Sequence, residues 1–210
     1  MGWLEGLEPS TSRATTWHSN QLSYSHRVDR KYRGGGILDP DHVRSSGEDG
    51  LTAALAQAGR DRFFMEQALR LAAAAGRHGE VPIGAVAVRA GEVIAVGSNQ
   101  VERRQDAAAH AEMLALRRAS RRLHSWRLEG VTVYSTLEPC PMCAGALLLS
   151  RVERVVYGAD DPRKGAFRSS YQVLGSSSGN HHPAVEAGCL ADRSASLLQR
   201  FFQELRGRDL

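Results

Sequence analysis

Strand-like and helix-like patterns alternate along residues 83–159, and this alternation limits the fold more than any other feature. The run "IGAVAVRAGEVIAVGSN" (83–99) predicts two strands about a turn at Ala90-Gly91, a hairpin. The patterns that follow are a helix at 109–123, a strand at 131–137, a helix at 143–150 and a strand within 151–159. Strands separated by single helices pair in parallel through crossover connections. We therefore predict an α/β domain with three layers, a sheet between helices.

Two more helices are predicted at the ends of this region. Residues 61–80 place their apolar side chains on one helical face, and Asp61 is a candidate N-cap. The run "LADRSASLLQRFFQELR" (190–206) is also helical, whereas residues 160–189 contain mostly loop signals. The predicted domain therefore spans residues 61–210.

Residues 1–60 lack a sustained apolar period and are broken by Gly, Pro, Ser and Thr. Such a stretch buries too little apolar surface to offset its ordering entropy, so we predict a flexible N-terminal extension. Its Ser and Arg content leaves organelle import open, but its seven acidic residues argue against a targeting role.

The composition indicates the class of protein and the compartment in which it works. Hydrophobic residues make up 42% and charged residues 24%, which is ordinary for a globular protein. No apolar run approaches the roughly 20 residues of a membrane helix, so no membrane partner is expected. Three cysteines favour a reducing compartment, and we expect a cytoplasmic protein. The net charge of +4 permits a polyanionic partner but is weak support for one.

The stretch "PCPMC" (139–143) holds two thiols at a spacing suited to a metal. A helix that begins near Pro141 would place Cys140 and Cys143 at its N-terminal turn, where the helix dipole favours the thiolate form. Two ligands alone leave other interpretations open, namely a redox dithiol or two small buried residues. A third ligand is needed to decide.

That third ligand is predicted within "AHAEM" (109–113), where His110 begins a helix. Three N and S ligands with one open position are typical of catalytic zinc, whereas a structural zinc has four protein ligands. Glu112 then serves as the proton carrier beside the metal. The combined pattern H-x-E with P-C-x-x-C is the general signature of zinc nucleobase deaminases, so we predict one Zn2+ held by His110, Cys140 and Cys143.

Longer segments around this signature carry a more specific resemblance. The segments "IGAVAV", "SNQVERRQDAAAHAEMLAL", "VTVYSTLEPCPMCAGALLLSRVERVVYGADDPRKGA" and "NHHPAVEAGCLA" together resemble the tRNA adenosine deaminases of the bacterial TadA type. The resemblance implies a cytidine-deaminase-like α-β-α fold with a five-stranded mixed sheet, and a homodimer with one zinc per subunit. It also implies hydrolytic conversion of adenosine to inosine at the wobble position of a tRNA anticodon stem-loop.

The same resemblance implies a set of substrate-binding residues. Asn99 matches the asparagine that binds base and ribose, and Asp161 matches an acidic position beside the flipped base. The remaining matches are Val81, Gly84 and Ala85 at the pocket, and Phe201 and Phe202 in the last helix. Lys164 is a further candidate for substrate binding, because it is one of the cations near the matched positions, with Arg163 and Arg168. Without the resemblance, Asn99 and Asp161 would be read as turn residues, and the two phenylalanines as core packing. Cys189 is not at a ligand spacing, and we expect it to be buried and inert.

Two other functions remain open at this point. One is the deamination of a free nucleobase or nucleoside of the guanine or cytosine type. The other is a catalytically idle zinc subunit, which the presence of Glu112 argues against. The segment "YGADDPRKGAFRSSYQ" (157–172) and the aromatic last helix favour a polymer substrate over a free base.

Overall fold

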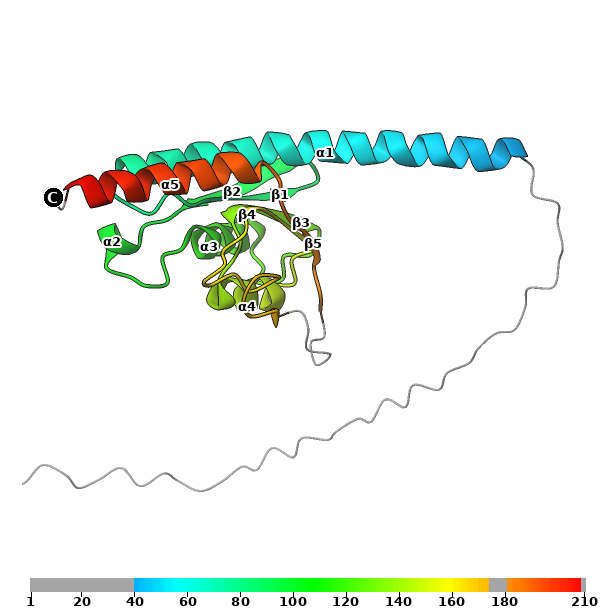
Figure 1. Cartoon of the computed structure of the whole chain (residues 1–210). Helices are drawn as coiled ribbons and strands as arrows, with labels where there is room; N and C mark the ends of the chain where they lie inside the picture. Colours follow the sequence, from blue (N-terminus) through cyan, green and yellow to red (C-terminus); the bar gives the residue numbers. More distant parts are fainter. Residues whose placement is uncertain (1–39, 174–180, 209–210) are drawn as a thin grey trace, which may run out of the picture. The chain divides into compact units, whose positions relative to one another are not determined.

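Five strands form one sheet in the order β2-β1-β3-β4-β5 in the computed structural model (Figure 1). The structure describes residues 40–173 and 181–208, with side chains from residue 50 onward. β1 (Gly84–Arg89) pairs antiparallel with β2 (Glu92–Ser98) and with β3 (Val131–Leu137). β4 (Arg154–Ala159) runs parallel to β3 and to β5 (Ala184–Glu186). The predicted five-stranded mixed sheet is confirmed.

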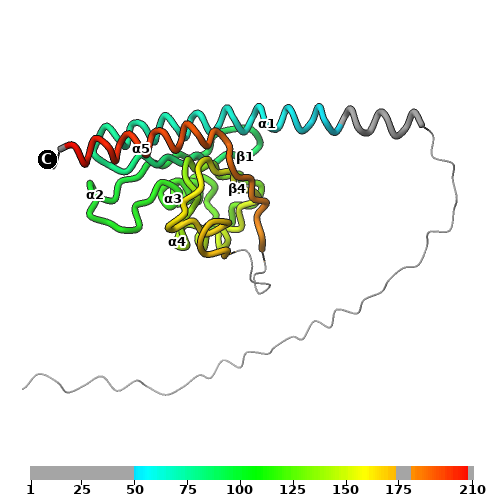
Figure 2. The backbone as a smooth tube through the Cα atoms, in the orientation of Figure 1, coloured from blue at the N-terminus to red at the C-terminus, as the bar shows by residue number. Residues whose placement is uncertain are grey.

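Helices cover the two faces of this sheet, as the backbone trace makes plain (Figure 2). α1 (Pro40–Arg77) and α5 (Ala191–Arg208) lie side by side on one face, joined by the ion pair between Glu66 and Arg193. α3 (Ala111–Leu123) and α4 (Pro141–Leu149) cover the other face. This is the expected three-layer α/β arrangement.

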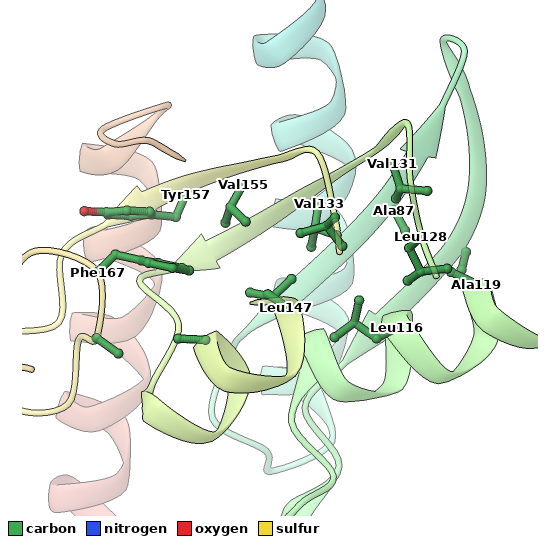
Figure 3. Packing of buried hydrophobic residues seen from close by; sticks show 14 residues of the cluster. Ala87, Leu116, Ala119, Leu128, Val131, Val133, Leu147, Val155, Tyr157 and Phe167 are labelled. Atoms are coloured by element: carbon green, nitrogen blue, oxygen red, sulfur yellow. The ribbon is translucent and has the colours of Figure 1, made fainter. Parts of the chain in front are cut away.

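The core divides into two clusters because neighbouring side chains of a strand point to opposite faces. Val133 of β3 belongs to the cluster beneath α3 and α4, whereas the next residue, Tyr134, packs against α1. Figure 3 shows Leu116 of α3 and Leu147 of α4 directed toward Val133 and Val155 of the sheet. The central strands β1, β3 and β4 are thus buried on both sides, which explains their near-continuous apolar sequences.

The hairpin turn lies at Ala90-Gly91, as the sequence predicts. Ala90 and Gly91 both have positive φ, 50° and 80°, as the tight turns that suit the twist of paired strands require. Two short elements were not predicted: β5 has only three residues, and α2 (Val101–Arg104) has four. Neither is long enough to display a recognisable apolar period.

The first helix begins at Pro40, so the prediction that it starts near Asp61 was wrong. Residues 50–60 are nearly all exposed, including Leu51 and Leu55, so burial of an apolar face does not hold this part of the helix. Asp61 is not a cap. Its carboxylate is 6% exposed and binds the Arg154 guanidinium through two bonds of 2.7 Å, while the Tyr134 hydroxyl donates at 2.8 Å. Asp61 therefore fastens α1 to β3 and β4.

Two glycines bring helix backbones close to the sheet. A Cβ on Gly84 would overlap the carbonyl oxygen of Ala68 in α1, and a Cβ on Gly97 would overlap the carbonyl oxygen of Ala111 in α3. The missing side chain at Gly97 lets the first turn of α3 lie directly on β2, which fixes where that helix begins.

Candidate metal centre and its surroundings

The predicted metal ligands lie where two helices begin. His110 is the N-cap of α3, Cys140 is the N-cap of α4, and Cys143 is buried in the first turn of α4. Pro141 occupies the first helical turn, as the sequence predicted, because proline there loses no hydrogen bond. The N–H groups that a first turn leaves unpaired favour negative charge, so both thiols have an environment suited to thiolate.

The three side chains converge at distances that suit a tetrahedral metal. The Nδ1 atom of His110 is 3.6 Å from Sγ of Cys140 and 3.5 Å from Sγ of Cys143. All three ligand atoms lie within 4.8 Å of one another. Zinc bonds of about 2.3 Å to sulfur and about 2.0 Å to nitrogen would place tetrahedral S and N ligands roughly 3.5 Å apart. The donor set and its spacing therefore fit Zn2+.

The protonation states of the ligands are coupled. A hydrogen bond from the Cys143 thiol, with a further one from His110, lowers the pKa of Cys140 to about 4. The same bond to Cys140, together with burial, raises the pKa of Cys143. The hydrogen bond with Cys140 and the nearby Glu112 charge raise the pKa of His110. One thiolate is therefore stabilised by the protein alone, and a divalent cation would stabilise the second.

Glu112 lies in the first turn of α3, two residues after His110, and is only 4% exposed. The Ser135 hydroxyl at the end of β3 donates to its Oε1 at 3.2 Å. Burial raises the pKa of Glu112, although His110 and Ser135 oppose the shift. A carboxyl group whose pKa is raised is a better proton acceptor than an ordinary one and can later return that proton.

Asn99 is held by a residue that sequence reasoning missed. The Glu80 carboxylate is 2% exposed and accepts a hydrogen bond from Asn99 Nδ2 at 3.3 Å. It also accepts the backbone N–H groups of Glu102 at 3.2 Å and Arg103 at 2.8 Å. Glu80 therefore fixes Asn99 and the start of α2 together. The only sequence signal was an acidic residue beside an apolar strand.

A second missed residue, Glu138, organises the loop after β4. Its carboxylate is 2% exposed and accepts hydrogen bonds from the loop backbone and from the Ser169 hydroxyl. Although burial acts to raise it, these bonds hold the pKa of Glu138 below its usual value. In the same loop, Asp161 Oδ1 accepts the N–H groups of Arg163 and Lys164. The predicted substrate loop is therefore ordered by two carboxylates.

Comparison with known proteins decides the family. Residues 58–159 match the family model of the cytidine and deoxycytidylate deaminase zinc-binding region. The chain is 48% identical over 147 residues to the tRNA-specific adenosine deaminase of Bacillus subtilis, a match that covers 70% of this chain and 91% of that relative. The chain belongs to the tRNA-specific adenosine deaminase family. It is accordingly a zinc-dependent hydrolytic deaminase, as the sequence predicted.

Solved structures agree with this assignment. A structure described in a study of A-to-I editing by tRNA:A34 deaminases is 43% identical, with a TM-score of 0.63, over 65% of this chain and 99% of that one. A guanine deaminase from Nitrosomonas europaea is 26% identical, with a TM-score of 0.55, over 67% of this chain and 83% of that one. A guanine deaminase therefore shares this fold, and deamination of a free base is the alternative that the sequence left open.

The predicted pocket residues divide between the two faces of the sheet. Ala85 is fully buried against Ala111 and Ala115 of α3, the helix that carries Glu112. Val81 is half-buried and directly follows Glu80. Gly84, which was expected at the pocket, instead faces α1. The physical reason is the alternation of a strand, which turns Gly84 and Ala85 to opposite sides.

The aromatic pair of this deaminase lies on α5. Phe201 is half-buried and stacks edge-to-face on Phe202, with 5.4 Å between ring centroids, and Phe202 is 37% exposed. α5 covers the sheet face opposite α3 and α4, whose first turns carry the metal ligands. A contact between these rings and a substrate stays a prediction.

Cys189 is half-buried rather than buried, and burial raises the pKa of its thiol.

A groove of about 400 Å³ between α1 and α5 is lined by Glu66, Arg70, Arg193 and Arg200, on the face away from the metal ligands. Among the described residues, no helix combines the length and apolarity that crossing a lipid bilayer requires.

Proposed function

We propose that this enzyme converts adenosine to inosine at the wobble position of a tRNA anticodon. The observation that carries the proposal is the convergence of His110, Cys140 and Cys143 beside the buried carboxyl of Glu112. The curated relatives at 41–48% identity are named tRNA-specific adenosine deaminases, which supports the choice of substrate.

His110, Cys140 and Cys143 would hold the zinc ion, which supplies Lewis acidity for the activation of water. Glu112 accepts a proton from the attacking water and transfers it to N1 of the adenine ring while a C–O bond forms at C6. Glu112 then carries the second water proton to the exocyclic amino group. The C6–N bond breaks, ammonia leaves, and the base becomes hypoxanthine, so all atoms balance and Glu112 returns to its starting state.

The groups that bind substrate are proposed from their positions. Asn99 is immobilised by Glu80, so its amide can meet the base and ribose without first losing rotamer freedom. Val81 and Ala85 would border the base, and Asp161 would contact the backbone beside it. Lys164 and Arg163 are exposed on the loop after β4 and would meet phosphates, while Phe201 and Phe202 would stack on loop nucleotides.

The alternative is deamination of free guanine, which the likeness to the Nitrosomonas europaea enzyme keeps open. Purified enzyme should be incubated separately with an anticodon stem-loop carrying a wobble adenosine, with free adenosine, with guanine and with cytidine. We expect inosine in the stem-loop and very poor turnover of the free compounds. Faster turnover of guanine or cytidine than of the stem-loop would establish the alternative instead. The variant Glu112→Ala is the control for background deamination.

The enzyme is further proposed to act as a homodimer. α4 is apolar throughout, "PMCAGALLL", yet Leu149 is 77% and Met142 38% exposed. Exposed apolar side chains that gather on one surface helix are typical of a protein–protein interface. Sedimentation equilibrium should give a dimer that Leu149→Glu weakens, whereas Leu205→Glu on α5 should leave it intact. A monomeric wild-type enzyme would refute this.

A cytoplasmic location is proposed because two of the three cysteines are suited to bind metal as thiolates, and a reducing compartment favours free thiols over disulfides. We also propose that residues 1–60 are an extension dispensable for chemistry and residues 61–210 the deaminase domain. Microscopy of the tagged full chain should find a diffuse cytoplasmic signal. Localisation to an organelle, lost on removal of the N-terminal segment, would reveal a targeting role instead.

A further inference from the structure

Glu138 occupies the junction between the sheet and the metal centre. It directly follows β3 and precedes the ligand Cys140 by two residues. With 2% exposure, its carboxylate is removed from water and must find its hydrogen bonds within the protein. Within the described part of the chain, all donors to this carboxylate lie in a single segment, residues 161–169.

The hydrogen bonds divide between the two carboxylate oxygens. Oε1 accepts the backbone N–H groups of Phe167 at 3.1 Å, Arg168 at 2.7 Å and Ser169 at 3.0 Å. Oε2 accepts the N–H of Asp161 at 3.1 Å and the hydroxyl of Ser169. Hydrogen bonds to a charged acceptor are stronger than those between neutral groups. One ionised side chain therefore replaces the regular backbone pairing that this loop lacks.

Two neighbouring features indicate that the loop is shaped around this carboxylate. A Cβ on Gly165 would overlap both Glu138 Oε2 and the carboxyl carbon, so only glycine fits that position. The N–H of Ala166 donates to the carbonyl of Pro139, the residue between Glu138 and Cys140. The loop is thus attached at several points to the three-residue segment that leads into α4.

The consequence concerns distance to the reaction. Arg163 and Lys164 lie between the two attachment points, Asp161 and Phe167, and their own N–H groups are bound by Asp161. Because Glu138 is covalently two residues from Cys140, its bonds set the offset between these cations and the metal ligands. Without these bonds, the loop would lose conformational freedom when a substrate binds, and this loss would weaken binding.

We propose that Glu138 is a positioning residue that holds the Arg163–Lys164 loop in register with the metal centre for the phosphates beside the target nucleotide. The inference rests on the proposed function, because it assigns the loop to an RNA substrate. Glu138 itself touches neither substrate nor the reacting atoms. Its effect is on substrate binding rather than on the chemical step.

The variant Glu138→Gln tests this directly. The amide can keep an oxygen at the Oε1 site, but its NH2 group then opposes the N–H of Asp161, which frees that end of the loop. We expect the KM for the anticodon stem-loop to rise about tenfold, with kcat changed less than about threefold. One zinc per chain should remain. The exposed Glu129→Gln is the matched control and should behave as wild type.

Two further measurements separate positioning from a general structural role. The double variant Arg163→Ala with Lys164→Ala removes what Glu138 is proposed to place, so adding Glu138→Gln to it should raise KM little further. Amide exchange of residues 161–169 should become faster in Glu138→Gln, whereas exchange in α3 should not. If Glu138→Gln folds poorly, Ser169→Ala removes one bond to Oε2 and should raise KM about two- to threefold in the same direction.

The inference is overturned if Glu138→Gln loses zinc and kcat together, if its KM is unchanged, or if its effect multiplies fully with that of the double variant. A wild-type enzyme that leaves the stem-loop unmodified would instead refute the proposed function, and this result appears before any substitution is made.

Discussion

At the scale of single residues, Cys140 and Cys189 are both partly exposed cysteines that differ in their surroundings. Cys140 begins a helix and lies 3.6 Å from His110, whereas Cys189 packs beside the Asp61–Arg154 pair in the other core cluster. Cys140→Ala should therefore lose stoichiometric zinc, and Cys189→Ala should retain one zinc per chain. Elemental analysis of the purified proteins measures both. Full zinc in Cys140→Ala would exclude this residue as a ligand.

How far the sequence could lead is also clearest at single residues. His110, Glu112, Cys140 and Cys143 were predictable because their spacing within two short segments is itself the chemical signal. Glu80 and Glu138 were not, since each binds backbone N–H groups roughly 20 to 30 positions away, and such pairing leaves no local pattern. Asp61 was misread for the same reason, because its partner Arg154 is 93 positions distant.

At the scale of elements, the alternating patterns predicted the hairpin, α3, α4 and the central strands because each buries a continuous apolar face. The start of α1 could not be predicted, since residues 50–60 are helical while nearly all exposed. β5 could not either, because it is three residues long and is defined by its pairing with β4. The formation of the edge strand β5 thus depends on tertiary context.

The attachment of α1 to the sheet gives a stability prediction. Asp61→Asn should reduce the free energy of unfolding at neutral pH by roughly 2–4 kcal/mol, because the half-buried Arg154 loses its closest counter-charge and keeps only Glu186 at 3.8 Å. The exposed Asp192→Asn on α5 is the control and should change stability by less than about 0.5 kcal/mol. Urea unfolding followed by circular dichroism measures both. Equal stabilities of the two variants would contradict the role given to Asp61.

The same pair sets a pH dependence. Burial acts to raise the pKa of Asp61, but the hydrogen bonds from Arg154, Tyr134 and Gln57 hold it below its usual value. Because its pKa is lowered in the folded state, Asp61 contributes its full stabilisation above its unfolded-state pKa of about 3.9. This stabilisation is lost as pH falls through the folded-state pKa. The stability gap between wild type and Asp61→Asn should therefore narrow only in acid. A gap that widens as pH falls would oppose this.

The loop after β4 makes a second prediction at this scale. Arg163→Ala with Lys164→Ala should raise the KM for the stem-loop. The slope of log binding constant against log salt concentration should become shallower by roughly 1.5, because fewer phosphate contacts form and fewer counterions are released on binding. The rate at saturation should fall less, because neither residue is a proposed metal ligand or the proposed proton carrier. Titration of binding against salt measures the slope. An unchanged slope would show that this loop is not the phosphate-binding surface.

At the scale of the whole molecule, the chain joins a deaminase domain to an N-terminal segment without periodic apolar pattern. Removal of residues 1–39, which lie outside the described residues, should leave deamination of the stem-loop within about twofold of the full chain. Steady-state assays on both proteins at equal zinc content measure this. A collapse of activity in a well-folded truncated enzyme would assign the segment to substrate binding.

The central claim is that Glu112 carries protons for a hydrolytic attack at C6 of a wobble adenosine. It is tested most directly by reaction of the stem-loop in oxygen-18-labelled water, followed by mass spectrometry of the nucleosides. Wild-type enzyme should give inosine with one labelled oxygen at C6 and release ammonia. Glu112→Ala should keep one zinc per chain and lose activity by at least about 10²-fold. Unlabelled inosine, or activity of Glu112→Ala within a few-fold of wild type, would contradict the mechanism.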